Sequence, residues 1–322
     1  MILAPLVLSV AAAWLALALL VPRLTASGLT GRDLHKPEQP DIAEMGGLGI
    51  VAGFVPGVLG AVALDTFLEG LVRVETVTLL AVLATVLIVA LVGVLDDLLD
   101  ISQSTKAVLP LLAAFPLVAI EAGQTTLAVP FLGRIDFGIA YALVLVPLGV
   151  TGAANAANML AGFNGLEVGL GLVATGSLAI IAAAIGATTA LVILLAGVGA
   201  LVGALRFNWL PARVMIGDVG TLSIGAIVAA AVIVGNFETA GVVVILPYAI
   251  DFLLKAASGF PSTDWWGELR GDGALHCPRT IPVSFPQLVM KLAGGVHERA
   301  LVLALMGVEA VFGALAIGLY VL

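Results

Sequence analysis

Three asparagines lie close together in the stretch NAANMLAGFNGLE, which runs from Asn155 to Glu167. Asn155 and Asn158 are three residues apart, so a helix would present both amides on one face. Amide oxygens are hard neutral ligands that suit Mg²⁺ beside a phosphate, and amide NH₂ groups can donate to a phosphate or a base. The glycines around Asn164 also fit a helix that ends in an asparagine-rich turn. The stretch alone leaves both interpretations open.

Two adjacent carboxylates form a second cluster. Asp96 and Asp97 follow a run of aliphatic residues, and Lys106 comes shortly after them. Adjacent carboxylates at a membrane boundary repel each other and are costly unless a cation or a proton is shared between them. The structural alternative is a solvated helix end.

A third cluster is Asp218 in RVMIGDVGTLSIG, directly before an apolar run. An aspartate that caps a helix is an ordinary structural device. In the functional interpretation the glycines allow close approach to the backbone, the helix start favours anions, and Asp218 supplies a charged metal ligand.

The clusters together combine acidic residues, amides and the basic residues Lys106 and Arg279. A divalent metal bound to a diphosphate requires this combination of side chains. We therefore interpret the clusters as one site for phosphoryl transfer at a membrane surface.

Other polar residues receive structural interpretations. Asp251 and Lys255 are four residues apart on a predicted helix, which favours an ion pair. Trp265 and Trp266 follow that helix and are typical of an interfacial aromatic belt. The segment Phe285–Ala293 is expected to form a short surface helix.

Membrane helices must position these residues. The chain is 61% hydrophobic and 11% charged, whereas about 25% of a soluble domain is charged. Apolar runs long enough to cross ~30 Å of hydrocarbon recur throughout, which indicates one domain over residues 1–322.

A single cysteine, Cys277, excludes an internal disulfide, and three histidines make no credible zinc cluster. The net charge of −8 is unusual beside anionic lipid and fits a cytoplasm of high salt.

The lengths of the apolar runs and the breaks between them predict ten membrane-spanning helices. They cover residues 2–22, 46–64, 76–95, 106–122, 138–158, 166–186, 188–205, 219–235, 239–258 and 300–321. Glycine, proline and β-branched residues in GQTTLAVPFLGRIDFG predict a short β-hairpin between the fourth and fifth helices. The expected fold class is an all-α integral membrane protein with one small external hairpin.

Basic residues decide the expected orientation. An even number of spans places both termini on one side. With the termini outside the cytoplasm, eleven Lys and Arg residues fall on inner segments, and Arg73 and Arg134 remain outside. This orientation places all three polar clusters and a long loop, 258–298, on the cytoplasmic face.

In this order the motifs resemble those of the polyprenyl-phosphate N-acetylhexosamine-1-phosphate transferases, of the glycosyltransferase 4 type. The similar blocks are KPEQPDIAEMGGLGI, GVLDDLLDISQSTKAVLP, NAANMLAGFNGLEVG and NWLPARVMIGDVGTLSIG, which together span nearly the whole chain. The Asn-Gly-Leu-Glu and HCPRTIP sequences are most similar to the archaeal and eukaryotic branch that makes N-acetylglucosaminyl-diphospho-dolichol. The bacterial phospho-MurNAc-pentapeptide translocase branch has an Asp-Gly-rich block and a histidine-rich last loop, which this chain lacks.

The resemblance implies a reaction, a cofactor and partners. N-acetylhexosamine-1-phosphate, GlcNAc-1-phosphate in this branch, would pass from a UDP-sugar to polyprenyl or dolichyl phosphate with release of UMP. This would be the first membrane step of glycan assembly, N-glycan assembly in this branch. Mg²⁺ is the implied cofactor, with Mn²⁺ as the alternative. The partners are UDP-N-acetylhexosamine, the lipid phosphate and the bilayer; no nucleic acid is expected, and a homodimer is left open.

The resemblance also implies roles for residues of the acidic and amide blocks. Asp218 and Asn158 would bind the metal, and Lys106 would contact the phosphates. Asp96 and Asp97 would lie near the lipid phosphate, where either could act as a base. A phosphate monoester is already ionised near pH 7, so the reaction need not use one.

Four further residues are implied to bind substrate. Asn164 would contact uridine, Asn155 would hold the amide block in place, and Glu44 matches an acidic residue near the lipid or nucleotide site. Arg279 matches a loop arginine that helps to bind the diphosphate sugar.

The chain departs from the eukaryotic pattern at two positions. Ile281 stands where the eukaryotic pattern has a second loop arginine, so the resemblance does not carry the family's sugar recognition over to this chain directly. Met215 stands at an aromatic position that stacks on uracil.

Two other functions fit parts of the pattern. A secondary transporter for a nucleotide sugar or an anion would also need many helices and intramembrane charges, but transporters place their site near the midplane between repeated halves. Here the polar clusters lie at one boundary and the sequence shows no repeat. A transferase of the same family that uses another UDP-sugar is the second alternative.

Overall fold

The structure is a computed structural model that describes residues 2–68, 73–99, 101–129, 132–261 and 265–321. Within these residues, nine helices are long and apolar enough to cross a membrane. They are α1 (Ala4–Ala26), α2 (Gly47–Phe67), α3 (Thr76–Leu99), α7 (Val146–Met159) with the π-turn Tyr141–Leu145 before it, α8 (Leu166–Ala184), α9 (Thr188–Asn208), α10 (Gly217–Gly235), α11 (Glu238–Ala257) and α13 (Glu298–Val321). The mostly helical membrane fold agrees with the sequence prediction.

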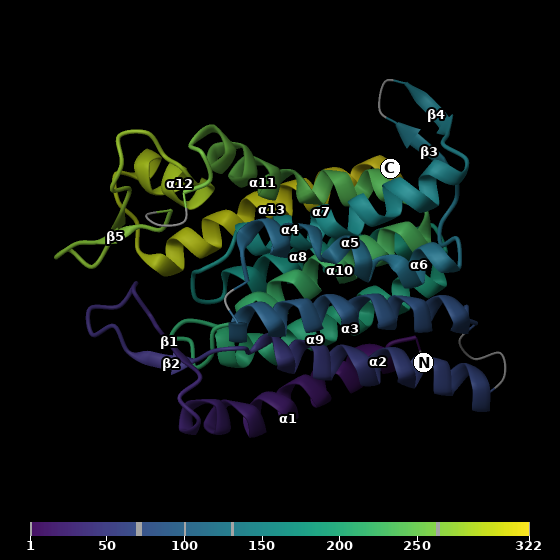
Figure 1. Cartoon of the computed structure of the whole chain (residues 1–322), viewed down its shortest axis with the longest axis horizontal. Helices are drawn as coiled ribbons and strands as arrows, with labels where there is room; N and C mark the ends of the chain where they lie inside the picture. Colours follow the sequence, from purple (N-terminus) through teal and green to yellow (C-terminus); the bar gives the residue numbers. More distant parts are fainter. Residues whose placement is uncertain (1, 69–72, 100, 130–131, 262–264, 322) are drawn as a thin grey trace.

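The predicted fourth helix, 106–122, is not one continuous helix. The structure has three short helices in its place, α4 (Gln103–Val108), α5 (Pro110–Ala113) and α6 (Phe115–Ala119), which follow one another along the bundle (Figure 1). A proline lacks the backbone N–H of a helix and disfavours the helical conformation of the residue before it. Two prolines therefore divide the segment, and the described residues contain nine long apolar helices rather than ten.

The remaining elements are three small antiparallel sheets and one short helix. The strands are β1 (Thr30–Arg32) with β2 (Asp41–Ala43), β3 (Thr126–Val129) with β4 (Gly133–Asp136), and β5 (Glu268–Leu269) with β6 (Leu275–His276). The β3–β4 pair lies in the segment for which the sequence predicts a hairpin. The short helix α12 (Phe285–Ala293) confirms the predicted surface helix.

Small residues allow the helices at one side of the bundle to approach closely. A Cβ on Gly199 of α9 would lie 2.3 Å from the carbonyl oxygen of Leu6 on α1, and one on Gly203 would lie 2.8 Å from that of Val10. Membrane helices use such residues because packing replaces the hydrophobic driving force that is weak between helices in lipid. The glycine and alanine content of the sequence therefore reflects close helix packing.

Helix α10 lies at the centre of the bundle. Every residue from 219 to 233 is buried, and α10 packs against α2, α3, α7 and α9. At its start, a Cβ on Gly47 of α2 would lie 2.1 Å from the Gly220 nitrogen, and one on Gly93 of α3 would lie 2.4 Å from the Val219 Cα. Three helices thus meet main chain to main chain where α10 begins.

The two ends of the bundle differ. Figure 1 shows the start of α1 and the end of α13 at the same end, together with the β3–β4 hairpin. The β1–β2 and β5–β6 pairs and α12 lie at the opposite end. The two described ends of the chain therefore lie opposite the loops that carry the β1–β2 and β5–β6 pairs.

Candidate functional site

A carboxylate from α3 holds the first turn of α10. Asp97 accepts hydrogen bonds from the backbone N–H groups of Asp218 at 2.8 Å and Val219 at 3.2 Å. Gly217 has φ +69°, and a Cβ there would lie 2.6 Å from Asp97 Oδ2, so glycine is needed for this approach. Helix α10 begins at Gly217, so Asp218 lies in its first turn and is not its N-cap; the N-cap residue, Ile216, makes no side-chain capping hydrogen bond. Asp97 supplies the cap instead, and the interpretation of Asp218 as a helix cap is wrong.

Lys106 connects two of the predicted acidic residues. Its side chain is buried on α4, and Nζ lies 2.8 Å from Asp96 Oδ2 and contacts Asp218 Oδ2. The hydroxyl of Ser102 caps α4 by accepting from the N–H of Thr105 at 3.3 Å. The end of α3 and the start of α10 therefore share one ammonium group.

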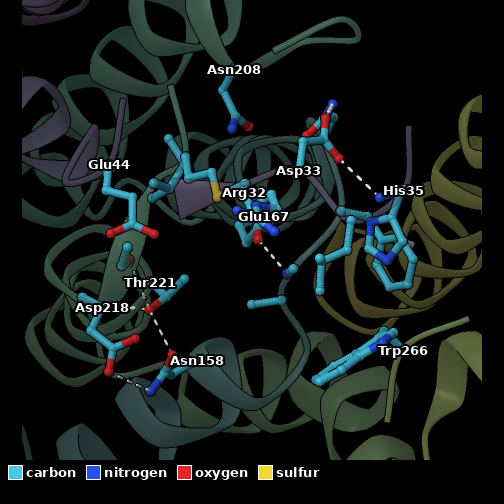
Figure 2. Close-up of a pocket in the computed structure, with 18 of the residues that line it drawn as sticks. Arg32, Asp33, His35, Glu44, Asn158, Glu167, Asn208, Asp218, Thr221 and Trp266 are labelled. Carbon is cyan, nitrogen blue, oxygen red and sulfur yellow. Dashed lines mark hydrogen bonds between the residues drawn. The ribbon is translucent and has the colours of Figure 1, made fainter. Parts of the chain in front are cut away.

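The two asparagines of α7 contact different partners. Asn158 Nδ2 donates to Asp218 Oδ2 at 3.3 Å, and its Oδ1 accepts from the Thr221 hydroxyl at 3.0 Å (Figure 2). Asn155 Nδ2 donates to the carbonyl oxygen of Ala107 at 3.1 Å. Asn158 therefore belongs to the acidic cluster, whereas Asn155 holds α7 against α4.

A cavity of about 390 Å³ opens beside this cluster. We call one side of it the acidic end, which consists of Glu44, Asp97, Asn158, Asp218 and Thr221. The other side, the aromatic end, consists of Asp33, His35, Phe163, Asn164, Trp265 and Trp266. Figure 2 shows Asp218 and Asn158 across the cavity from Asp33 and His35. The cavity thus has one wall rich in carboxylates and one that offers rings and an amide.

The acidic end carries more negative than positive charge. In the described part of the chain, one cation contacts this group of carboxylates. It is Lys106, which pairs with Asp96 and Asp218. Clustered carboxylates are costly unless a cation compensates them. Carboxylate and amide oxygens are the hard ligands that a divalent cation such as Mg²⁺ prefers. The side chains present therefore fit a divalent ion, which Asp218 and Asn158 would hold.

Glu44 lies on the acidic end, just after β2. Burial and the negative charge of Asp97 raise the pKa of its carboxyl group. A Cβ on Gly31 would lie 1.9 Å from Glu44 Oε1, so the β1 strand passes directly over this side chain. The first loop thus reaches the cavity through Glu44.

Polar residues from three distant segments meet at the aromatic end. Asn164 donates from its side chain to Asp33 Oδ2 and from its backbone to Glu298 Oε1, both at 2.9 Å. Lys36 Nζ lies 3.4 Å from Asp33 Oδ2 and contacts Glu298. Asp33, His35 and Glu298 lie close enough together to hold a metal ion, but the Lys36 ammonium already pairs with both acids. We call Asp33, Lys36, Asn164 and Glu298 the Asp33 network.

His35 packs its ring against Phe163, with 4.5 Å between ring centroids and 12° between ring planes. Burial lowers the pKa of His35 to about 4, although the charge of Asp33 acts in the opposite direction. The imidazole is therefore neutral near pH 7. It forms a flat aromatic wall rather than a charged one.

The predicted site residues fall into three groups. Those that line the cavity are Glu44, Asp97, Asn158, Asn164 and Asp218. Those that contact the lining or support it from behind are Asp96, Lys106 and Asn155. Arg279 lies apart, exposed in the loop after β6, where Cys277 Sγ donates to its carbonyl oxygen at 3.2 Å.

The structure corrects the interpretation of the tryptophan pair. Trp265 and Trp266 are partly buried and line the cavity, so they do not form an interfacial belt. Lys255 lies 4.7 Å from the Trp265 ring centroid, and its ion pair with Asp251, at 2.8 Å, confirms the predicted pair. A tryptophan pair after a membrane helix fits a belt and a cavity wall equally well, so the sequence offers no signal that separates them.

Sequence reasoning also missed the Asp33 network. Asn164 is 131 residues from Asp33 and 134 residues from Glu298. Neither acid belongs to a cluster in the sequence, because the three segments come together only in the folded chain.

Comparison with known proteins gives one family and several long matches. Residues 79–236 match the family described as glycosyl transferase family 4, from α3 to the end of α10. A Saccharolobus solfataricus protein, provisionally named UDP-N-acetylglucosamine–dolichyl-phosphate N-acetylglucosaminephosphotransferase, is 35% identical over 98% of this chain and 96% of its own. A Sulfolobus acidocaldarius protein of the same provisional name is 38% identical over 90% of this chain and 87% of its own. The Schizosaccharomyces pombe protein with that name is 29% identical over 83% of this chain and 67% of its own.

Proposed function

Because this chain belongs to glycosyl transferase family 4, we propose that it transfers GlcNAc-1-phosphate from UDP-GlcNAc to dolichyl phosphate and releases UMP. The relatives carry names that describe this transfer. The observation that supports it best is the cavity, whose acidic end fits a metal-bound diphosphate and whose aromatic end fits a nucleobase. The reaction begins the assembly of a lipid-linked glycan, and we propose an N-glycan.

The reaction exchanges one phosphoanhydride bond for another. An oxygen of the lipid phosphate attacks the β-phosphorus of UDP-GlcNAc, and the bond from that phosphorus to the bridging oxygen breaks. UMP leaves with the electron pair of that bond. Both reactants are anionic, so catalysis depends mainly on positioning and charge compensation. Lys106 supplies a fixed positive charge where the acidic clusters of α3 and α10 meet.

We propose that Asp218 and Asn158 hold Mg²⁺, with Mn²⁺ as an alternative. The ion, when bound, compensates charge on the diphosphate and on the departing UMP. Asp97 acts as a positioning residue, because both its oxygens accept from the backbone that carries Asp218. Asp96 orients Lys106 through their 2.8 Å contact.

At the aromatic end, Asn164 is proposed to bind the uracil base. Its side-chain NH₂ donates to Asp33, and no described residue donates to its Oδ1. The carbonyl oxygen therefore remains to accept a hydrogen bond from the N3–H of uracil. Met215 lines the cavity and offers an apolar surface to the ring. The contact of Arg279 with the sugar diphosphate stays a prediction, because that side chain is exposed outside the cavity lining.

The proposed setting is the cell membrane, with the cavity on the cytoplasmic face and both termini outside. The helices α4, α5 and α6 would together make a tenth crossing. Two observations support this arrangement: the start of α1 and the end of α13 lie at one end of the bundle (Figure 1), and most Lys and Arg residues belong to the predicted inner segments.

Measurement of the soluble product tests the proposed reaction. Purified protein is incubated with Mg²⁺, dolichyl phosphate and a panel of UDP-sugars, with matched samples that lack the lipid or contain a chelator. We expect UMP only when both Mg²⁺ and the lipid are present, with UDP-GlcNAc as the best donor. Release of UDP would refute phosphosugar transfer. No turnover, combined with uptake of a UDP-sugar into vesicles, would favour the transporter.

A further inference from the structure

A second hollow lies on the outer side of the bundle, where α1 packs against α9. Its volume is about 330 Å³. Trp14, Ala18 and Val21 of α1 form an apolar wall, and Arg206 and Arg213 face it from the end of α9 and the loop that follows. We call this feature the arginine hollow.

The two arginines have no acidic partner among the residues that the structure describes. Within that part of the chain, the guanidinium groups of Arg206 and Arg213 make neither an ion pair nor a side-chain hydrogen bond, and both residues are exposed. The backbone N–H of Arg213 donates to the carbonyl oxygen of Phe207 at 2.7 Å, which fixes Arg213 close to the end of α9. Two like charges held at one hollow repel each other, and an anion bound between them would remove that repulsion. The chain as a whole is acidic, with a net charge of −8, whereas the arginine hollow is locally positive.

The surroundings of the hollow distinguish a lipid from a soluble anion. The outer face of α1 exposes large apolar side chains, including Leu15 and Leu19, as a surface that contacts lipid does. The hollow lies at the end of this face, beside the half-exposed ring of Trp14. Inorganic phosphate would use the arginines and leave the apolar wall bare. A phospholipid would use both, because its acyl chain covers the wall while its phosphate accepts paired hydrogen bonds from guanidinium groups.

We propose that the arginine hollow binds an anionic phospholipid from the leaflet on the cavity side of the membrane. The segment 209–216 joins α9 to α10 and carries Arg213, and the N–H of Met215 in it donates to the carbonyl oxygen of Ala43 at 2.7 Å. Met215 also lines the cavity. A lipid held by Arg213 therefore stabilises the connection that leads to the start of α10. This proposal does not rest on the proposed reaction, since the arginine hollow shares no lining residue with the cavity.

Lipid retention and thermal stability test the proposal. The wild type and the R206Q/R213Q double variant are purified in detergent, given phosphatidylglycerol or phosphatidylcholine, and studied by native mass spectrometry and by thermal unfolding. R134Q is the matched single-charge control, because Arg134 lies on β4 at the opposite end of the bundle. We expect wild type and R134Q to retain phosphatidylglycerol and to unfold at a higher temperature with it. The double variant should bind phosphatidylglycerol roughly tenfold more weakly or worse, because two charge-assisted contacts are lost.

Further arms separate the possible ligands. Inorganic phosphate should give no comparable stabilisation, and an equal effect would overturn the proposal in favour of a simple anion site. Equal retention of phosphatidylcholine, or unchanged retention of phosphatidylglycerol by the double variant, would also overturn it. R206K/R213K keeps the charge and loses the guanidinium forks, so it should retain an intermediate amount. The unfolding temperature in detergent alone shows whether each variant is folded.

Discussion

Asp218 has the most consequential contacts at the acidic end, since it meets Lys106 and the Asn158 amide and follows the glycine at which α10 begins. We expect Asp218→Asn to lower divalent-dependent turnover by on the order of 10²–10³-fold, because a charged ligand is lost from the diphosphate site. The fold should survive, since Lys106 keeps its contact with Asp96. Turnover and unfolding temperature are measured beside Asp41→Asn, an exposed carboxylate on β2. Retained turnover in D218N would place the metal site elsewhere.

Asp33 fixes which way the Asn164 amide faces, and this orientation leads to a prediction about base preference. The buried carboxylate can only accept, so it holds the NH₂ of Asn164 and leaves the carbonyl oxygen for a donor such as N3–H of uracil. Cytosine has an acceptor at that position. Asp33→Asn could instead donate to the Asn164 oxygen, so the amide could turn round and present its NH₂ to the base.

We therefore expect the wild type to bind UMP and to discriminate against CMP, and D33N to lose roughly tenfold or more of that discrimination. Competition by the two nucleotides, measured as binding to the detergent-purified protein, gives the ratio directly. A folded D33N protein with the wild-type ratio would contradict the orienting role of Asp33. Absence of UMP binding to the wild type would count against the proposed nucleotide site itself.

At the scale of single elements, the short helix α4 depends on its neighbour α7. Asn155 joins them through the Ala107 carbonyl oxygen, one residue after Lys106. We expect Asn155→Ala to cost about 1 kcal/mol of stability and to lower kcat about tenfold, with a smaller change in KM for UDP-GlcNAc, because the lysine loses its fixed position. Thr66→Ala on α2 removes another side-chain to main-chain hydrogen bond and serves as the control. Equal kinetic losses in both variants would argue against a positioning role.

The sequence predicted most elements well, and its failures have physical causes. Apolar length located the long helices, and α12 was predicted at its observed bounds, because both signals are local. The segment 106–122 was predicted as one span because its composition is apolar, but two prolines divide it into α4, α5 and α6. Hydropathy records how apolar a segment is and does not record whether its hydrogen-bond ladder is continuous.

The same distinction applies to the site. Asp96, Asp97, Asn158 and Asp218 were found because each stands out locally in an apolar sequence, and the structure brings them together. The different contact that each of these residues makes was not predictable. That Asp97 caps α10 while Asp218 turns to Lys106 depends on how α3 meets α10, and no spacing within either motif encodes that contact.

At the scale of the whole molecule, stability should depend on pH through His35. Its pKa is about 4 in the folded chain, against the ordinary histidine value of 6.5 that applies once the chain unfolds. Between these values the unfolded chain binds more protons, so stability is full above about pH 6.5 and falls as the pH decreases toward about 4, by about 3 kcal/mol at most. His35→Phe keeps a ring against Phe163 and removes the titration. We expect H35F to show a smaller drop in unfolding temperature than wild type between about pH 7.5 and about pH 5, whereas H297Q, at an exposed histidine, should behave as wild type.

The proposed orientation makes a prediction for the two ends of the bundle. In a Cys277→Ser background, Arg134→Cys places a thiol on β4 and Asp272→Cys places one between β5 and β6. An impermeant maleimide applied to intact cells should label R134C, and D272C should react only after the membrane is opened. The reverse pattern would invert the orientation. Labelling of both from outside would mean that the two loops lie on the same side.

The main-chain contacts at the start of α10 bear on how this enzyme could be altered by laboratory evolution. Where Gly47 and Gly93 face α10, and where Gly217 faces Asp97, there is no room for a side chain, so libraries should leave these positions unchanged. The wall made by Trp265 and Trp266 is built from side chains and can vary without moving a helix. Selection for transfer of a different sugar should therefore recover substitutions in the last loop, while the end of the cavity that carries the chemistry stays constant.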